Sequence, residues 1–195
     1  MTADIADVWD SEAGRFDAEP DHGLLQPRVR AAWQRLLEQE IPAGASVLDV
    51  GCGTGTLSVL LAEHGCRVTG VDLSPRMVER ARAKGVQHDV SVERLLGDAS
   101  DPPVPPSFDV VLARHVLWAL PDPSAVVDRW LALTAAAGKL VLVEGLWGTG
   151  AGLPADAVAD LVRPKVSSLS VRHLTDPVLW GRAIDDERCL VVAKK

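Results

Sequence analysis

Residues 46–56 read Ser-Val-Leu-Asp-Val-Gly-Cys-Gly-Thr-Gly-Thr, a strand-type run that ends in a turn with three glycines. An apolar stretch of helical character, residues 57–64, follows at once. Such an arrangement is typical of a nucleotide cradle, because glycines let the backbone approach a ligand and the helix start offers free N–H groups. Asp49 decides between ligands, since its carboxylate repels a pyrophosphate and attracts an ammonium or sulfonium group. The stretch therefore predicts a nucleotide-type site for a cationic ligand.

The glycine spacing argues against two other phosphate-binding loops. A dinucleotide site reads G-x-G-x-x-G, but Thr56 occupies the third-glycine position. A P-loop ends in Gly-Lys-Ser/Thr, which is missing. With Asp49 in front, the run resembles motif I of class I S-adenosylmethionine-dependent methyltransferases, commonly D/E-x-G-x-G-x-G. The resemblance implies cofactor binding by Asp49, Gly51, Cys52, Gly53, Gly55 and Thr56. The alternative is a glycine turn without a ligand.

Composition restricts the class of protein. A length of 195 residues with 47% apolar residues favours one domain with a substantial core. The net charge of −7 comes with no basic block, which argues against nucleic acid as a partner. Three cysteines, Cys52, Cys66 and Cys189, have neither metal nor disulfide spacing. With no membrane-length apolar run and an N-terminus unlike a signal peptide, we expect a cytoplasmic protein without a metal or a membrane partner.

Strands and helices alternate along most of the chain. Residues 1–26 are polar and irregular, and residues 27–40 form an amphipathic helix ended by Pro42 and Gly44. Strands are expected at 47–50, 67–71, 90–95, 108–112, 139–144, 171–174 and 189–193, and helices at 74–84, 124–136 (closed by Gly138) and 154–164. Near-continuous apolar strands alternating with helices indicate a parallel sheet covered on both faces.

Two further acids end predicted strands. Asp72 lies about 20 residues past the first glycine, where an acid accepts hydrogen bonds from ribose hydroxyls, and a helix-capping role is the compatible alternative. Asp98 follows the third strand, and its alternative is a turn residue. By resemblance, Leu73 and Met77 pack against the adenine, and Asp98 with Ala99 receives the adenine amino group.

The resemblance covers residues 45–145 well and the flanking parts loosely. It implies a three-layer, Rossmann-like α/β fold with a seven-stranded, mostly parallel sheet and an N-terminal helical lid. We expect a single methyltransferase domain over 1–195. Its parts are lid and N-terminal helices (1–44), a cofactor-binding core (45–145), and a substrate-side loop with closing strands (146–195).

Methyl transfer from a sulfonium is an in-line displacement that needs alignment and the exclusion of water. A base is needed only if the acceptor arrives protonated, and His115 is the first candidate, with a pKa near neutrality. His22 is the second candidate. For both histidines the alternative is a capping, packing or turn role. Arg114 contacts the cofactor carboxylate or a substrate acid, or else a structural ion pair.

Four aromatic residues are expected at the lid or the acceptor end of the site: Trp9, Phe16, Trp118 and Trp147. For each tryptophan, core packing is the alternative. We therefore expect a transferase that uses S-adenosylmethionine, releases S-adenosylhomocysteine and acts on a small molecule. The alternatives are a cofactor-binding regulatory protein and a nicotinamide-dependent oxidoreductase. Neither the acceptor nor the oligomeric state follows from the sequence.

Overall fold

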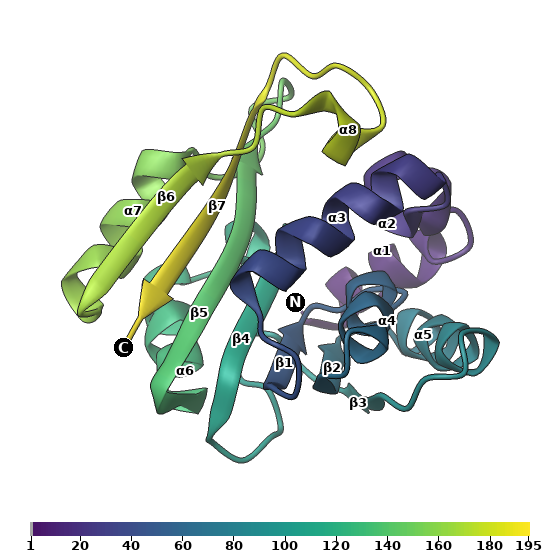
Figure 1. The fold of residues 1–195 in the computed structure, drawn as a ribbon, viewed down its shortest axis with the longest axis horizontal. Coiled ribbons are helices and arrows are strands. Elements are labelled where there is room, and N and C mark those ends of the chain that lie inside the picture. Colours follow the sequence, from purple (N-terminus) through teal and green to yellow (C-terminus); the bar gives the residue numbers. More distant parts are fainter. Residues whose placement is uncertain (1) are drawn as a thin grey trace.

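A seven-stranded sheet forms the centre of the molecule (Figure 1), with the strand order β3-β2-β1-β4-β5-β7-β6. The computed structural model describes residues 2–195, with side chains from Ile5 onward; Met1, part of the expected lid, lies outside the described residues. The strands are β1 (Ser46–Val50), β2 (Arg67–Asp72), β3 (Glu93–Leu96), β4 (Phe108–Arg114), β5 (Thr134–Leu146), β6 (Ser168–His173) and β7 (Glu187–Lys194). The pairs from β3 through β5 are parallel, and β7 is antiparallel to both its neighbours. The expected Rossmann-like α/β fold is confirmed.

Helices cover both faces of the sheet. They are α1 (Thr2–Glu12), α2 (Pro20–Gly23), α3 (Pro27–Glu40), α4 (Thr56–Glu63), α5 (Pro75–Gln87), α6 (Pro123–Leu133), α7 (Ala155–Val162) and α8 (Pro177–Trp180). One apolar core joins the sheet to α3, α4 and α8, and a second joins its other face to α6 and α7. This is why the central strands have apolar side chains on both faces.

Two helices form as their sequences predict. Helix α3 spans Pro27–Glu40 with Pro27 at its first position, and it buries Trp33 completely. The Trp33 Nε1–H donates to the Leu179 carbonyl at 2.8 Å, so its polar atom is satisfied inside the core. Helix α5 begins at Pro75, and the Ser74 hydroxyl caps it by accepting from the Met77 N–H at 3.0 Å.

The irregular conformation expected for residues 1–26 from their pattern is wrong, whereas the N-terminal helices implied by the resemblance are present. Residues 2–12 form helix α1, and Ile5, Val8 and Trp9 follow the i, i+3, i+4 spacing of a helix face. The Asp10 carboxylate accepts a hydrogen bond from the Ser74 hydroxyl and one from the Arg76 N–H at 3.1 Å. These contacts with α5 stabilise a helix that is too short to be stable alone.

The predicted boundary between residues 124–136 and the fifth strand is also wrong. Helix α6 ends at Leu133, and β5 begins at Thr134, which pairs with Phe108 of β4. Pairing with β4 overrides the helix propensity of the alanines at 135–137. Gly138 lies inside β5 at a register shift, where a side chain would meet the Asp109 carbonyl at 2.8 Å.

Other elements occur where the sequence predicts them, with shifted ends. The third strand begins at Glu93, the fourth extends to Arg114, and the closing strands span 168–173 and 187–194. The helix expected at 154–164 spans Ala155–Val162, and α8 was not predicted. Among residues 2–195, no helix is long and apolar enough to cross a membrane.

Gly55 and Gly65 provide a matched pair for testing how tightly the glycine loop packs. Both have positive φ, at 78° and 91°, but a Cβ at Gly55 would lie 2.9 Å from the Ala81 Cβ, whereas Gly65 faces open space. We expect Gly65→Ala to cost about 1–2 kcal/mol of unfolding free energy from backbone strain alone. Gly55→Ala should cost about 1–3 kcal/mol more because it overpacks the contact with α5. Urea unfolding measures both, and equal losses would contradict the close packing.

Candidate active site

The glycine loop between β1 and α4 lies over the carboxyl ends of β1 and β2. Gly51, Gly53 and Gly55 have φ angles of 64°, 55° and 78°, which residues with side chains rarely adopt. The Gly53 N–H donates to the Asp72 carboxylate at 2.8 Å. A Cβ at Gly51 would lie 2.4 Å from a Val116 methyl group, so the loop approaches the segment after β4 only because this position lacks a side chain.

A cavity of about 340 Å³ lies beside this loop. Most of the predicted site residues line it: Trp9, Phe16, His22, Asp49, Gly51, Cys52, Gly53, Asp72, Leu73, Met77, Asp98, Ala99, Arg114, His115, Trp118 and Trp147. The cavity is also lined by seven residues that the sequence did not predict: Ile5, Leu57, Ser100, Val116, Ala119, Leu120 and Pro121. The cavity occupies the carboxyl edge of the parallel strands, where open α/β sheets bind ligands.

Two predicted loop residues are not part of the cavity lining. Gly55 packs against Ala81 of α5. The Thr56 hydroxyl accepts a hydrogen bond from the Lys84 ammonium at 2.6 Å. Both residues therefore contact helix α5, which supports the glycine loop.

Asp49 is the most deeply buried acid of the cavity, with 3% of its surface exposed. One carboxylate oxygen accepts a hydrogen bond from the Ser58 hydroxyl at 2.6 Å. Burial raises the pKa of Asp49 to about 6, against the opposing effect of the Ser58 hydrogen bond. Asp49 forms no ion pair with a described basic residue, so the cavity contains a carboxylate whose ionised form a cationic ligand would stabilise.

Asp72 and Asp98 also line the cavity, and each holds nearby backbone. Asp72 accepts hydrogen bonds from the Gly53 N–H and from the Ser74 N–H, the latter at 2.9 Å. Burial raises the pKa of Asp72, and these N–H groups oppose the shift. Asp98 accepts from the N–H and the hydroxyl of Ser100, both at 2.8 Å. The expected turn role of Asp98 is present. Asp72 does not cap α5 itself but holds the N–H of Ser74, the residue that does. The ribose and adenine roles of the two acids stay predictions.

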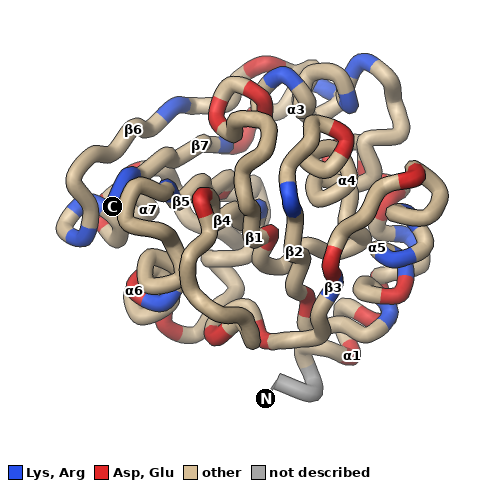
Figure 2. The backbone as a smooth tube through the Cα atoms, turned by 60° about the horizontal axis from the view of Figure 1, so that its bottom comes forward, with Lys and Arg blue, Asp and Glu red and all other residues tan. Residues whose placement is uncertain are grey.

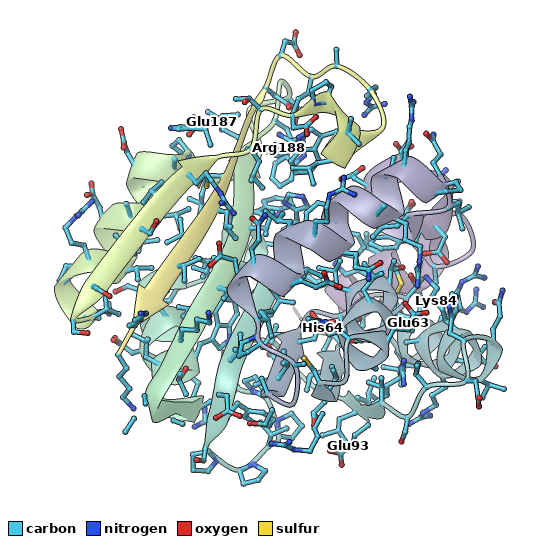
Figure 3. The ribbon with its side chains drawn as sticks, viewed as in Figure 1. Glu63, His64, Lys84, Glu93, Glu187 and Arg188 are labelled. Atoms are coloured by element: carbon cyan, nitrogen blue, oxygen red, sulfur yellow. The ribbon has the colours of Figure 1, made fainter. Side chains whose placement is uncertain are left out.

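Lys84, which Figure 3 labels, joins the N-terminal segment to the glycine loop through its hydrogen bonds. Its ammonium donates to Asp17 and to the Thr54 hydroxyl, both at 2.9 Å, and to the Thr56 hydroxyl. The Thr54 hydroxyl also donates to Asp17 at 2.5 Å. Both Lys84 and Asp17 are largely buried, with 14% and 19% of their side chains exposed. This network connects the wall formed by residues 5–22 to helix α5.

Arg114 ends β4 as a half-buried cation. It donates to the Asp21 carbonyl, and its guanidinium lies 5.0 Å from the centre of the Trp33 ring. Burial lowers the pKa of Arg114. It has no ion pair among the described residues, so its charge is balanced only by more distant carboxylates, Asp21, Asp49 and Asp17.

His115 follows Arg114 and is half-buried; both of its ring nitrogens are buried, and neither is hydrogen-bonded to a described residue. Its expected near-neutral pKa is wrong: burial lowers the pKa well below 6.5, and the charges of Arg114 and Arg188 lower it further. His22 stacks on Phe16 at 4.3 Å between ring centres, and burial lowers its pKa as well. Both imidazoles are therefore neutral near pH 7.

Aromatic rings surround His115 at one end of the cavity. Trp147 lies 5.1 Å from His115 and 5.4 Å from Trp118, measured between ring centres. Behind Trp147, the Arg188 guanidinium lies 4.9 Å from its ring and 5.4 Å from that of Trp180. Figure 3 labels Arg188 on β7 near α8. This end of the cavity is therefore aromatic, with the cations Arg114 and Arg188 nearby. The three acids Asp49, Asp72 and Asp98 lie instead at the carboxyl ends of β1, β2 and β3.

Three residues that support the site were missed by the sequence analysis: Lys84, Glu144 and Arg188. Each acts across a long sequence separation, and each stands in an ordinary helix or strand pattern. Only Glu144 gave a signal in the sequence, as a charged residue after the apolar run Leu-Val-Leu-Val, whereas Lys84 and Arg188 stand among other charged residues. In the described part of the chain, no cluster of three metal-ligand side chains is present.

Residues 48–142 match a family model described as a methyltransferase domain. Among curated proteins, the ubiquinone biosynthesis O-methyltransferase of Xanthomonas axonopodis pv. citri (strain 306) is 36% identical over 136 residues, which are 69% of this chain and 54% of that protein. The same enzyme of Coxiella burnetii (strain Dugway 5J108-111) is 36% identical over 146 residues, covering 71% and 57%. The chain thus spans about half the length of these relatives.

Solved structures share the fold. The N-methyltransferase NodS from Bradyrhizobium japonicum WM9, in complex with S-adenosyl-l-homocysteine, matches with a TM-score of 0.72 and 21% identity, covering 96% of this chain and 98% of NodS. The [4+2]-cyclase SpnF matches with a TM-score of 0.73 and 19% identity, covering 84% and 80%. The strand order and the glycine loop define a Rossmann-like methyltransferase fold. The matched family model identifies residues 48–142 as a methyltransferase domain, and the fold is that of the class I S-adenosylmethionine-dependent methyltransferases.

The Lys84–Asp17 pair should control the stability of the N-terminal wall. We expect Asp17→Asn to accelerate amide hydrogen exchange in residues 5–23, because it removes the negative charge that compensates the buried Lys84 ammonium. Glu12→Gln is the control, since it removes an exposed pair with Arg15 on the same segment. Exchange measured by mass spectrometry should change in the first variant only, and equal protection in both would contradict the role of the network.

Proposed function

We propose that this chain transfers a methyl group from S-adenosylmethionine to a small-molecule acceptor. The observation that carries the proposal is the Asp49 carboxylate, buried in the cavity beside the glycine loop without a basic partner among the described residues. A cofactor with a positive charge matches it, and a pyrophosphate does not. The cavity volume of about 340 Å³ suits a small-molecule ligand.

The residues at the strand ends fit the parts of this cofactor. Asp49 and the glycine loop would hold its amino-acid part, Asp72 the ribose, and Asp98 with Ala99 the adenine. Leu73 and Met77 would pack against the adenine ring, since both line the same cavity. Arg114 would pair with a carboxylate, either that of the cofactor or one on the acceptor. These assignments rest on cavity position and charge.

S-adenosylmethionine supplies an activated methyl group on its sulfonium sulfur. The chain's own task is then to align the acceptor and exclude water. The wall formed by Trp9, Phe16 and His22 covers the cavity from the N-terminal side, so residues 2–26 act as its lid. His115 accepts the proton of a protonated acceptor, because its neutral imidazole has two nitrogens without hydrogen-bond partners among the described residues.

The acceptor end favours a flat, neutral or anionic molecule. Trp118 and Trp147 offer aromatic faces, while Arg114 and Arg188 disfavour a cationic group there. The curated relatives are O-methyltransferases by name, which supports an acceptor oxygen. We infer that the chain acts as one unit, with residues 146–195 completing the acceptor side of the core.

Surface charge supports a small-molecule partner over nucleic acid. In Figure 2, acidic and basic residues are interspersed along the described chain, and the net charge is −7. A nucleic-acid site normally needs a concentrated basic surface. A cytoplasmic location is part of the proposal and rests on the three cysteines, which are free thiols.

A cofactor-binding protein without its own transfer activity is the alternative function. The [4+2]-cyclase has the same fold, and one fold can carry different reactions. An activity measurement is therefore what distinguishes the two functions. Incubating the protein with S-adenosylmethionine and a panel of phenols, acids and amines tests the proposal. Formation of S-adenosylhomocysteine with a methylated product supports it. Cofactor binding without any product across the panel would favour the alternative.

The pKa of Asp49 predicts how cofactor affinity depends on pH. A raised pKa of about 6 means that Asp49 is protonated in the free protein at pH 5 and ionised at pH 7. A cationic ligand needs the ionised form, so the affinity for S-adenosylmethionine should rise with pH and level off above about pH 7. The limiting slope below pH 6 is about tenfold per pH unit for one linked proton.

Asp49→Asn is the matched control, because its amide oxygen can still accept from the Ser58 hydroxyl. Its affinity should be lower at pH 7 and nearly flat between pH 5 and 7. Calorimetry over this range measures both proteins. The same pH slope in the variant would show that another group titrates, and binding of NAD in place of S-adenosylmethionine would refute the cofactor assignment.

His115→Ala should impair turnover far more than cofactor binding. Loss of a general base typically costs about 10²- to 10⁴-fold in kcat. Because the pKa of His115 lies well below 6.5, the wild-type kcat should be constant above pH 7 and fall only in acid, where the imidazole is protonated. Kinetics across pH with an identified acceptor test this expectation. Normal kcat in the variant would mean that the acceptor is already ionised or that His22 serves as base.

A further inference from the structure

Glu144 is a buried acid that the proposed reaction does not yet use. It lies on β5, adjacent to the acceptor end of the cavity, and none of its surface is exposed. One of its carboxylate oxygens, Oε2, has no hydrogen-bond partner among the described residues. Burial raises the pKa of Glu144 to about 7. Burying such a carboxyl group costs free energy unless its hydrogen bonds compensate for the lost hydration.

The other oxygen of Glu144 binds two consecutive backbone N–H groups. Oε1 accepts from the Val116 N–H at 3.0 Å and from the Leu117 N–H at 2.8 Å. Successive N–H groups that follow a left-handed residue form a concave anion-binding arrangement. The residue before them is His115, whose φ is +59°. The carboxylate thus occupies a backbone nest that the conformation of His115 creates.

The conformation of His115 needs support from outside the turn. A left-handed backbone is unfavourable for a residue with a side chain, and it persists only where its surroundings determine it. The His115 N–H donates to the Val143 carbonyl at 2.8 Å, and the His115 carbonyl accepts from the Trp118 Nε1–H at 3.0 Å. Together with the two bonds to Glu144, four hydrogen bonds fix the turn between β4 and the 3₁₀ turn at Leu117–Ala119.

We propose that Glu144 is a positioning residue: by binding the two N–H groups after His115, it fixes the turn that directs the His115 and Trp118 side chains into the acceptor end of the cavity. Both side chains line the cavity, and Glu144 does not. Glu144 therefore acts through His115 and Trp118 and not by contact with a ligand. The kinetic part of this proposal rests on the proposed function, and the structural part does not.

Two substitutions separate hydrogen bonding from side-chain volume. Glu144→Gln retains an oxygen that can accept from both N–H groups, whereas Glu144→Met has a similar length and no comparable acceptor. Thr134→Val is the matched control: it removes a buried side-chain hydrogen bond at the other end of the same strand, from the Thr134 hydroxyl to the Trp130 carbonyl at 2.9 Å, and Thr134 does not line the cavity.

The first readout does not depend on activity. NMR of the five histidines, labelled with ¹⁵N in the ring, reports their surroundings, and the signals lost in His115→Ala identify His115. We expect Glu144→Met to shift or broaden the His115 signals, and Glu144→Gln and Thr134→Val to leave them in place. Unchanged His115 signals in Glu144→Met would overturn the proposal and leave Glu144 as a structural partner of the turn only.

The second readout is a double-mutant cycle in turnover. With an identified acceptor, Glu144→Met should lower kcat at least tenfold and change the affinity for S-adenosylmethionine less than twofold, and Glu144→Gln should keep kcat within threefold of the wild type. If Glu144 acts through His115, adding Glu144→Met to His115→Ala should cost little further. Full additivity of the two losses, or an equal loss in Glu144→Gln, would contradict the proposal.

The proposal stays testable if Glu144→Met does not fold or if no acceptor is methylated. If Glu144→Met does not fold, Glu144→Asp replaces it, because the shorter side chain withdraws the acceptor from the turn and should give the same His115 signal changes. If the wild type binds the cofactor but methylates no acceptor, the proposed function fails, and the NMR comparison still decides whether Glu144 positions His115.

Discussion

The arrangement of the site depends on the Asp72 carboxylate and its two backbone partners. One oxygen holds the glycine loop through the Gly53 N–H, and the other holds the start of α5 through the Ser74 N–H. Helix α5 then carries the N-terminal wall: Asp10 contacts its first turn and Asp17 contacts Lys84 near its end. A single carboxylate at the end of β2 therefore couples the loop, the helix and the cavity wall. Since buried hydrogen bonds to charged groups are strong, these parts form one connected unit.

Much of the site follows from local sequence, because its residues stand where strands end. Asp49, Asp72, Asp98 and Arg114 terminate or directly follow apolar strand segments, and parallel strands bring such ends to one edge of the sheet. The cap at Ser74 was equally readable, since serine before proline at a helix start has a local mechanism. Residues of the N-terminal helical segment line the cavity, and its role as a lid stays a prediction. The residue pattern alone was interpreted as irregular, despite the apolar spacing of α1.

What the sequence did not reveal depends on contacts between distant segments. The end of α6 is decided by pairing between Thr134 and Phe108, which overrides the local preference of three alanines for helix. The pKa of His115 depends on burial and on Arg188, 73 residues further along the chain. Neither effect can be deduced from the residues next to His115, so the prediction of a near-neutral pKa was wrong. The Glu144 nest likewise exists only because β4 and β5 are neighbours. Periodicity alone contains none of this information.

The position of β7 has a consequence for how the chain folds. β7 is inserted between β5 and β6, so within residues 2–195 the only strand that pairs with β6 is β7, which follows it in the chain. The β6 segment must remain unpaired until β7 forms, and pairings of this kind are slow because they close a loop before they gain hydrogen bonds. Loss of β7 would also release β6, which makes these two strands a cooperative unit in partial unfolding. The aromatic end of the cavity, where Arg188 on β7 packs against Trp147, should thus be the last part of the molecule to reach its native form.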